Sequence, residues 1–291
     1  MRLKITHETR YRYTDPPASL IEVLRLTPRN SAQLSVREWG IQVSTDSTLR
    51  RFDDAFGNIT HTFSAAGPVE ELVITAVGTV ETDPGNGVLA GTREPLPVGV
   101  FLRDTDLTDH SAALDALARE AAAQSDGSPL DTLHKLNAAV HDAVSVKPGF
   151  PSLNTTADDA LKTGEGVCQD CAHVFIAAAR AANIPARYVM GYHYAADAPQ
   201  TGRPGHAWAE AHVADLGWVG FDPTLRQSPD EAYVRVAVGL DYLSAAPVRG
   251  AMYGGTGETL DVAVSIAPTP AFGSPHGQVQ RQSQSQSQTN S

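Results

Sequence analysis

The first 82 residues alternate between apolar and polar side chains, which is the period of a β-strand with one buried face. The first such run has on one side Leu3, Ile5, His7, Thr9, Tyr11 and Tyr13. Further strands are predicted at residues 20–26, 36–43, 49–53, 59–64 and 70–81. Phe56-Gly57-Asn58 is typical of a hairpin turn, because Gly and Asn tolerate positive φ. Repeated short strands with turns between them predict an N-terminal, β-sandwich-like domain at residues 1–82.

The pattern changes after residues 83–99, a segment rich in proline and glycine that we interpret as a linker. Helical spacing then predicts helices at 108–124, 130–144 and 168–182, with a short helix capped by Thr156 and ended by Gly164. Strands are predicted to follow at 186–195, 206–214, 217–221, 233–239 and 258–266. Helices followed by strands indicate an α+β arrangement, and we assign residues 100–273 to this second domain.

Residues 274–291 are polar and of low complexity, with glutamine at every second position from Gln280 to Gln288. Such a segment cannot bury enough apolar surface to offset the entropy lost on ordering. We therefore predict a disordered tail.

Composition and charge narrow the range of partners. The 291 residues include 22 Lys and Arg against 33 Asp and Glu, a net charge of −11. This acidic balance argues against general affinity for nucleic acid or for an anionic membrane.

No apolar run approaches the ~18 residues of a transmembrane helix, and the first residues lack an apolar signal core, so a cytoplasmic location is expected. Two cysteines exclude a disulfide framework.

Reactive chemistry is first indicated by Gly164-Glu165-Gly166-Val167-Cys168, where glycines lead directly into a predicted helix. The N–H groups and partial positive charge of a helix start favour a thiolate, so a cysteine there tends to be reactive. The same N–H groups can receive a developing oxyanion. A small buried structural cysteine is the competing interpretation, and this segment alone does not decide between the two.

Two further segments supply groups that can act with this cysteine. His206 begins a predicted strand, and histidine titrates in the range that is useful to a base. Asp222 ends a short apolar strand before Pro223, and if the two strands pair, its carboxylate can orient the imidazole. Taken singly, a strand-end histidine or a turn-forming aspartate is commonly structural. Their order along the chain, cysteine then histidine then aspartate, is that of papain-like arrangements.

Three motifs resemble the core of bacterial transglutaminase-like proteins. They are Val167-Cys168-Gln169-Asp170 with the Ile-Pro-Ala-Arg-Tyr-Val-Met-Gly-Tyr of residues 184–192, His206-Ala207-Trp208-Ala209-Glu210, and the Gly-Trp-Val-Gly-Phe-Asp-Pro-Thr of residues 217–224. The first 80 residues resemble the β-rich N-terminal region of the same proteins, so the resemblance covers nearly everything except the tail. It implies a papain-like, transglutaminase-like core in which a helix-start cysteine packs on an antiparallel β-sheet.

The resemblance also implies roles, residue by residue. Cys168 is the expected nucleophile, His206 the base and then the acid, and Asp222 the residue that orients the imidazole ring. The backbone N–H of Cys168 is the expected oxyanion donor. Further oxyanion or cleft candidates are Gln169, Trp208 and Tyr192. Cys171 departs from the family pattern, since many relatives carry an aromatic residue at this position.

The function that the resemblance implies is thiol-dependent acyl transfer on amide bonds of a protein or peptide substrate, through a thioester. Hydrolysis, as by a cysteine protease or amidase, is favoured over protein-glutamine transamidation, because bacterial members that resemble this chain are often described as proteases. No cofactor and no metal are expected.

Three other functions fit parts of the sequence. Cys168-Gln169-Asp170-Cys171 is a C-x-x-C at a helix start, as in thiol oxidoreductases, but it lacks the preceding βαβ context. A zinc site would use Cys168, Cys171 and His173, yet Cys168 and His173 are five apart on one helix and point in different directions. A non-catalytic peptide-binding module would not need all three triad positions, which are present here.

Overall fold

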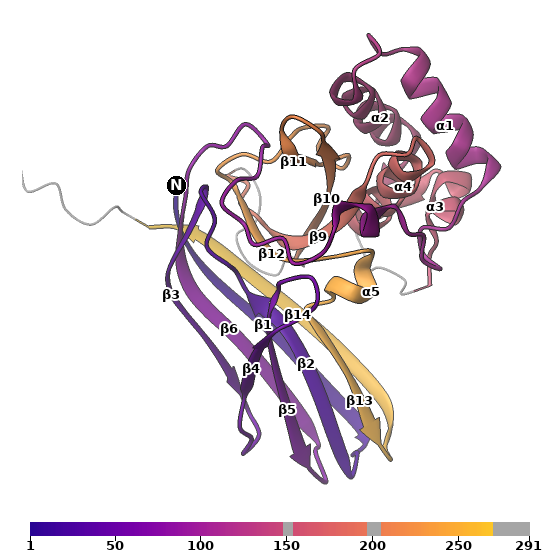
Figure 1. The fold of residues 1–291 in the computed structure, drawn as a ribbon. Helices are drawn as coiled ribbons and strands as arrows, with labels where there is room; N and C mark the ends of the chain where they lie inside the picture. Colours follow the sequence, from indigo (N-terminus) through magenta and orange to yellow (C-terminus); the bar gives the residue numbers. More distant parts are fainter. Residues whose placement is uncertain (148–153, 197–204, 270–291) are drawn as a thin grey trace, which may run out of the picture.

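The computed structural model describes residues 1–147, 154–196 and 205–269, which form a β-sandwich and an α+β core (Figure 1). The sandwich contains β1 (Arg2–Asp15), β2 (Ser19–Thr27), β3 (Leu34–Val43), β4 (Arg50–Asp53), β5 (Ile59–Ala66), β6 (Glu71–Thr82), β13 (Val248–Tyr253) and β14 (Thr256–Pro268). The core contains η1 (Val98–Leu102), α1 (Ala112–Ala123), α2 (Pro129–Ala143), β7 (Ser145–Val146), α3 (Ala157–Thr163), β8 (Glu165–Gly166), α4 (Cys168–Ala181), β9 (Ala186–His193), β10 (His206–Val213), β11 (Gly217–Phe221), β12 (Tyr233–Gly239) and α5 (Tyr242–Ala245). The predicted α+β class with a strand-rich N-terminal region is confirmed.

The sandwich consists of two four-stranded sheets, with strand orders β14-β1-β6-β3 and β13-β2-β5-β4. Alternation along the strands produces this layering, because the inward positions are mostly apolar. Leu3 and Ile5 of β1 are fully buried and belong to the same apolar cluster as Leu24 and Leu26 of β2. The sandwich core therefore forms from residues that the period-2 pattern already places on one face.

Strands β13 and β14 belong to the sandwich and not to the second domain, to which residues 100–273 were assigned from the sequence. β14 pairs with β1 from Leu3 opposite Pro268 to Asp15 opposite Thr256, and β13 pairs with β2. Figure 1 shows both yellow C-terminal strands beside the indigo N-terminal ones. Alternation predicts that residues 258–266 form a strand, but it cannot identify a partner that lies more than 240 residues away.

The core packs its helices around α4, which lies against β9 and β10 of an antiparallel sheet ordered β11-β10-β9-β12. β10 presents three small buried side chains to the apolar cluster that includes α4, namely Ala207, Ala209 and Ala211. Small side chains let the helix approach the sheet closely. Thr156 and Asp159 form the capping box of α3, and Gly164, at φ 66°, ends it, as the sequence predicts.

Buried polar contacts join the sandwich to the core. The Asn58 side chain donates to the carbonyl of Val238 and accepts from its N–H, each at 2.8 Å. His7 Nδ1 lies 3.0 Å from the Tyr192 hydroxyl, and the Thr82 hydroxyl donates to the Glu231 carbonyl at 2.5 Å. Because buried polar groups left without a partner would be costly, the contacts favour one relative placement of the two units.

In the part of the chain described by the structure, every helix is too short or too polar to cross a membrane. The predicted tail at residues 274–291 lies outside the described residues, as do most residues of the loop between β9 and β10.

The pairing of β14 with β1 can be tested by removing buried methyl groups from β14. Val264 and Ile266 are 2% and 8% exposed, so Val264→Ala and Ile266→Ala should each lower the free energy of unfolding by about 1–4 kcal/mol. Leu260→Ala on the same strand is the matched control, because Leu260 is 41% exposed, and it should cost about 0.5 kcal/mol or less. Urea denaturation followed by circular dichroism measures the three values. Equal losses at all three positions would contradict the placement of β14.

Candidate active site

Cys168 is the first residue of α4, and the chain before it is shaped to expose the helix start. Val167 precedes the helix, and its N–H donates to Asp170 Oδ2 at 2.8 Å. A side chain at Gly166 would collide with this carboxylate, because a Cβ there would lie 2.8 Å from the Asp170 Cβ. The Gly166-Val167-Cys168 sequence thus lets Asp170 fold back and satisfy the helix start, while Cys168 stays only partly buried.

The backbone N–H of Cys168 points out of the first turn of α4, where helical geometry gives it no partner within the helix. It is therefore placed to donate to an oxyanion that forms on a group bonded to the cysteine sulfur. The neighbouring Gln169 turns its side chain to the hydroxyl of the buried Tyr188. Its Oε1 is buried without a hydrogen-bond partner among the described residues.

His206 and Asp222 meet because two strands pair. β10 begins at His206, β11 ends at Phe221, and Ala209 lies opposite Phe221 in the register, so both side chains come to the same end of the sheet. His206 Nε2 lies 2.6 Å from Asp222 Oδ2, and the Cys168 thiol is also hydrogen-bonded to the His206 side chain. With Nε2 held by the carboxylate, Nδ1 is the nitrogen left to face the sulfur. The structure therefore brings together the three residues that the sequence singled out.

The Asp222 carboxylate is fully buried and has several donors. Besides the contact with His206, Oδ2 accepts from the Tyr233 hydroxyl at 2.7 Å. Oδ1 accepts from the backbone N–H groups of Thr224 and Leu225 at 2.9 and 3.3 Å. Burial alone would raise the pKa of this carboxyl, but the hydrogen bond and charge of His206, with the Tyr233 hydroxyl, hold the pKa below its usual value.

The same pairing favours the protonated form of His206, whose side chain is 15% exposed. Burial opposes the positive charge, but the hydrogen bonds to Asp222 and Cys168 and the negative charges of these groups outweigh it, and the pKa of His206 rises to about 10. The pairing therefore makes its full contribution to the stability of the fold at pH values below 6.5, the ordinary pKa of histidine. This contribution is lost as the pH rises through about 10, the raised pKa of His206. An imidazolium beside a cysteine is the setting that stabilises a thiolate.

Aromatic rings enclose the histidine from one side. Trp208 stacks on His206 with ring centroids 6.1 Å apart, and Tyr233 packs edge-on against Trp208 at 5.3 Å. Trp208 can lie flat on the sheet because Gly191 is beneath it, where a Cβ would come within 2.6 Å of the indole. Trp208, predicted as a cleft residue, is 2% exposed, so it supports the histidine ring from within the core.

Tyr192, also predicted as a cleft residue, is not brought to the triad. Its hydroxyl contacts His7, and its ring lies 6.5 Å from that of Trp39, so both neighbours belong to the sandwich. Gly191 and Tyr192 alternate along β9 and point to opposite faces, which the sequence could show, but the face that meets the sandwich depends on the placement of the two units.

Two residues of the site were missed by the sequence reasoning, Tyr233 and Gln227. Gln227 Nε2 donates to the Tyr233 hydroxyl at 2.9 Å, and the Gln227 backbone pairs with that of Asp222 through two N–H groups. Tyr233 starts a strand that was predicted at 233–239, but its distance from Asp222 depends on how the intervening turn folds. No local pattern in the sequence signals that contact.

Cys171 and His173, on which the alternative redox and zinc interpretations rest, are both buried. Burial raises the pKa of the Cys171 thiol to about 12, and no disulfide joins it to Cys168. The His173 Nε2 accepts from the backbone N–H of Tyr242 at 3.0 Å, and its Nδ1 is buried without a hydrogen-bond partner among the described residues. Within the described ranges, no group of three His, Cys, Asp or Glu side chains gathers to hold a metal ion.

Selective alkylation tests the different settings of the two cysteines. At pH 7, iodoacetamide should modify Cys168 at least about tenfold faster than Cys171, because Cys168 is partly exposed beside His206 and Cys171 is buried with a raised pKa. Peptide mapping by mass spectrometry measures the two rates in the folded protein. Unfolding in urea is the control, since it should make the two rates similar. Faster modification of Cys171 in the folded protein would overturn this assignment.

The Tyr233 hydroxyl can be tested through the titration of His206. Tyr233→Phe removes one donor from Asp222 and makes the carboxylate more basic, so the pKa of His206 should rise further. Stability should fall by about 1–2 kcal/mol, because a hydrogen bond to a charged group is lost. Histidine ring resonances followed by NMR report the titration. Tyr253→Phe is the control, since Tyr253 is 77% exposed on β13. An unchanged His206 titration would exclude this role for Tyr233.

Comparison with known proteins places this arrangement in a family. The Transglutaminase-like superfamily pattern matches residues 115–223, and the Bacterial transglutaminase-like N-terminal region matches residues 3–81. The solved structure of a candidate cysteine protease from Cytophaga hutchinsonii superposes with a TM-score of 0.72 at 21% identity, covering 93% of this chain and 92% of that chain. This likeness shows that the two proteins share a fold.

Two sequence relatives complete the comparison. A protein-glutamine gamma-glutamyltransferase of Pseudomonas aeruginosa is 30% identical over 127 residues, which are 39% of this chain and 18% of that protein. An uncharacterized protein of Mycobacterium leprae is 31% identical over 280 residues, which are 91% of this chain and 98% of the relative. Both family patterns occur here in chain order, and the chain belongs to the transglutaminase-like superfamily.

Proposed function

We propose that this protein catalyses thiol-dependent acyl transfer on amide bonds of a protein or peptide, with Cys168 as the nucleophile. The observation that carries the proposal is the continuous hydrogen-bonded chain from Cys168 through His206 to Asp222. A nucleophile, a base within its reach and a third group that orients the base are the parts needed for covalent catalysis.

Each step of the reaction has a residue that fits it. The Cys168 sulfur attacks the amide carbon, and the backbone N–H at the start of α4 donates to the developing oxyanion. The His206 imidazolium then gives its proton to the nitrogen that leaves as an amine, and a thioester remains on Cys168. Neutral His206 next takes a proton from the incoming water or amine, which attacks the thioester and releases Cys168. Asp222 keeps the ring oriented and stabilises its charge throughout.

Hydrolysis is the favoured outcome, with transamidation as the second candidate. The fold likeness to a candidate cysteine protease over more than nine-tenths of both chains supports attack by water. The match to a protein-glutamine gamma-glutamyltransferase supports attack by an amine, but it covers 39% of this chain. Both outcomes share the thioester, so the nature of the second nucleophile alone separates them.

Product analysis distinguishes the two outcomes. The protein is incubated with a peptide library that contains glutamine, with and without a primary amine such as monodansylcadaverine, and the products are identified by mass spectrometry. We expect cleaved or deamidated peptides in both reactions. Exclusive incorporation of the amine would replace hydrolysis by transamidation as the function.

Variants of the triad provide the control for either outcome. Cys168→Ala should abolish turnover, because no other group forms the thioester, and His206→Ala should be almost as severe. Asp222→Ala should retain more activity, and Asp222→Asn more still, since an asparagine can hold one imidazole tautomer. The values of kcat/KM, with folding checked by circular dichroism, give the order. A well-folded His206→Ala protein with full activity would refute the triad.

A further inference from the structure

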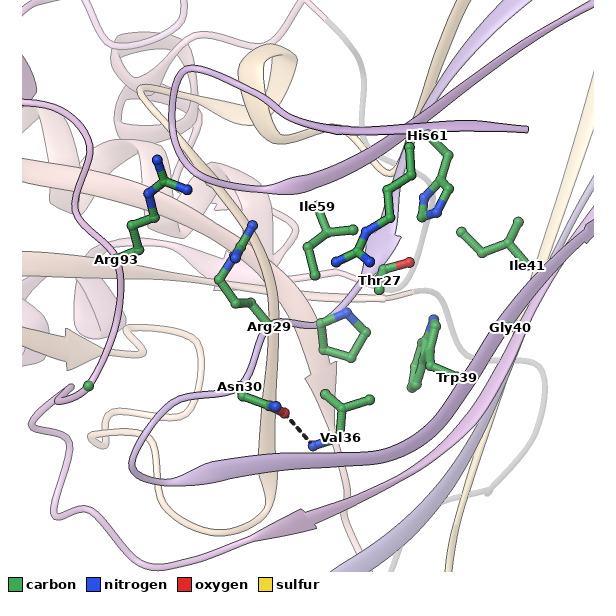
Figure 2. Close-up of a pocket in the computed structure, with 13 residues that line it drawn as sticks. Thr27, Arg29, Asn30, Val36, Trp39, Gly40, Ile41, Ile59, His61 and Arg93 are labelled. Atoms are coloured by element: carbon green, nitrogen blue, oxygen red, sulfur yellow. Dashed lines mark hydrogen bonds between the residues drawn. The ribbon is translucent and has the colours of Figure 1, made fainter. Parts of the chain in front are cut away.

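The sandwich contains a cavity of about 520 Å³ that includes no residue of the triad. It lies between β3 and β4, which are the outermost strands of the two sheets on the same side of the sandwich. The linker contributes Gly91 and Arg93 to its lining. Figure 2 shows Arg29 and Arg93 on one side of the cavity, and Trp39 and Ile41 on the opposite side. Its volume lies within the ~300–1,000 Å³ that is typical of small-molecule sites.

Positive charge lines the cavity without an acidic side chain among its lining residues. Arg29 and Arg93 both pair with Asp53, which lies outside the lining. Arg51 lies opposite His61 in the pairing of β4 with β5, so the two side chains share one face of the sheet. In the described part of the chain, no carboxylate lies within ion-pair distance of Arg51. The guanidinium of Arg51 is therefore available to an anion.

Two polar atoms beside this charge lack hydrogen-bond partners among the described residues. They are Thr27 Oγ1 and His61 Nδ1, and both are buried. Burial and the nearby Arg51 lower the pKa of His61, so a neutral ring with one unused nitrogen lies next to a cation. A buried polar atom without a partner is costly, so a bound group that supplied a hydrogen-bond partner would be favoured at these positions.

The opposite wall of the cavity is apolar. It is formed by Val36, Trp39 and Ile41 of β3. The Trp39 indole N–H already donates to the Leu26 carbonyl at 2.9 Å, which leaves the ring as a fixed flat surface. A ligand that fits this cavity therefore needs a charged end for the arginines and an apolar body for the tryptophan.

We propose that this cavity is a binding site for an anionic ligand in which a carboxylate or a phosphate is attached to an apolar or aromatic body. Arginine matches both anions through paired N–H groups, and Arg51 supplies the charge that the protein itself leaves unpaired. The site differs from the cysteine centre in position and in chemistry, and its occupation does not require a reactive thiol.

The tryptophans make the site measurable in the intact protein. Labelling with ¹⁵N-tryptophan gives one indole signal each for Trp39, Trp208 and Trp218, assigned by Trp39→Phe. Phenylacetate and phenyl phosphate serve as the carboxylate and phosphate probes, and phenylacetamide as the uncharged equivalent. We expect both anions to shift the Trp39 signal in a saturable way, while Trp208 beside His206 stays unchanged. Tighter binding of one anion identifies the preferred head group.

Arg51→Gln should weaken binding of the anions about tenfold, because it removes the unpaired cation. Arg50→Gln is the matched control, since Arg50 is the preceding residue of β4, faces the other side of the strand and does not line the cavity. Binding that phenylacetamide matches, or that both variants weaken equally, would overturn the proposal. A shift of Trp208 in place of Trp39 would also overturn it, because the anion would then lie at the cysteine centre.

Discussion

The site depends on the burial of one negative charge. Asp222 has no exposed surface, and an ionised carboxylate removed from water is tolerated only when charged or polar groups surround it. One oxygen is satisfied by the turn that follows β11, and the other by His206 and Tyr233. The hydrogen bonds that satisfy the buried carboxylate therefore determine the position of the imidazole, and with it the contact between His206 and Cys168.

A second buried carboxylate, Glu210, organises the side of the sheet that faces away from α4. It pairs with Arg187 at 2.7 Å and with Arg235 at 2.8 Å. Arg187 also pairs with Glu94 of the linker and lies 3.8 Å above the ring of Trp218. The linker is therefore held against the sheet by charge, and the sandwich joins the side of the core that the helices leave open.

How much could be predicted depends on the range of the interactions. Alternation predicts β1 to β6, and helical spacing predicts α1 to α4, because these patterns reflect neighbours in the chain. Cys168, His206 and Asp222 were found because each stands at the end of a predicted element, and the strand pairing brings them together. Tyr233 and the displaced Tyr192 were not found, since their contacts join segments whose separation only the folded chain defines. The cavity beside Trp39 could not be predicted from the sequence for the same reason, because five separate segments of the chain line it.

The placement of β14 has a consequence for the order in which the protein can form. β1 is synthesised before β14, and one of its edges stays without its partner until β14 has been made. The sheet formed by β9 to β12 contains only segments that lie between β1 and β14 in the chain, so it can form before β14 has been synthesised. During translation the nascent sandwich thus exposes an open strand edge, the feature most prone to pairing with other chains. A circular permutant that begins at β13 and joins the end of β14 to β1 would remove that interval, because both partners would then emerge from the ribosome together.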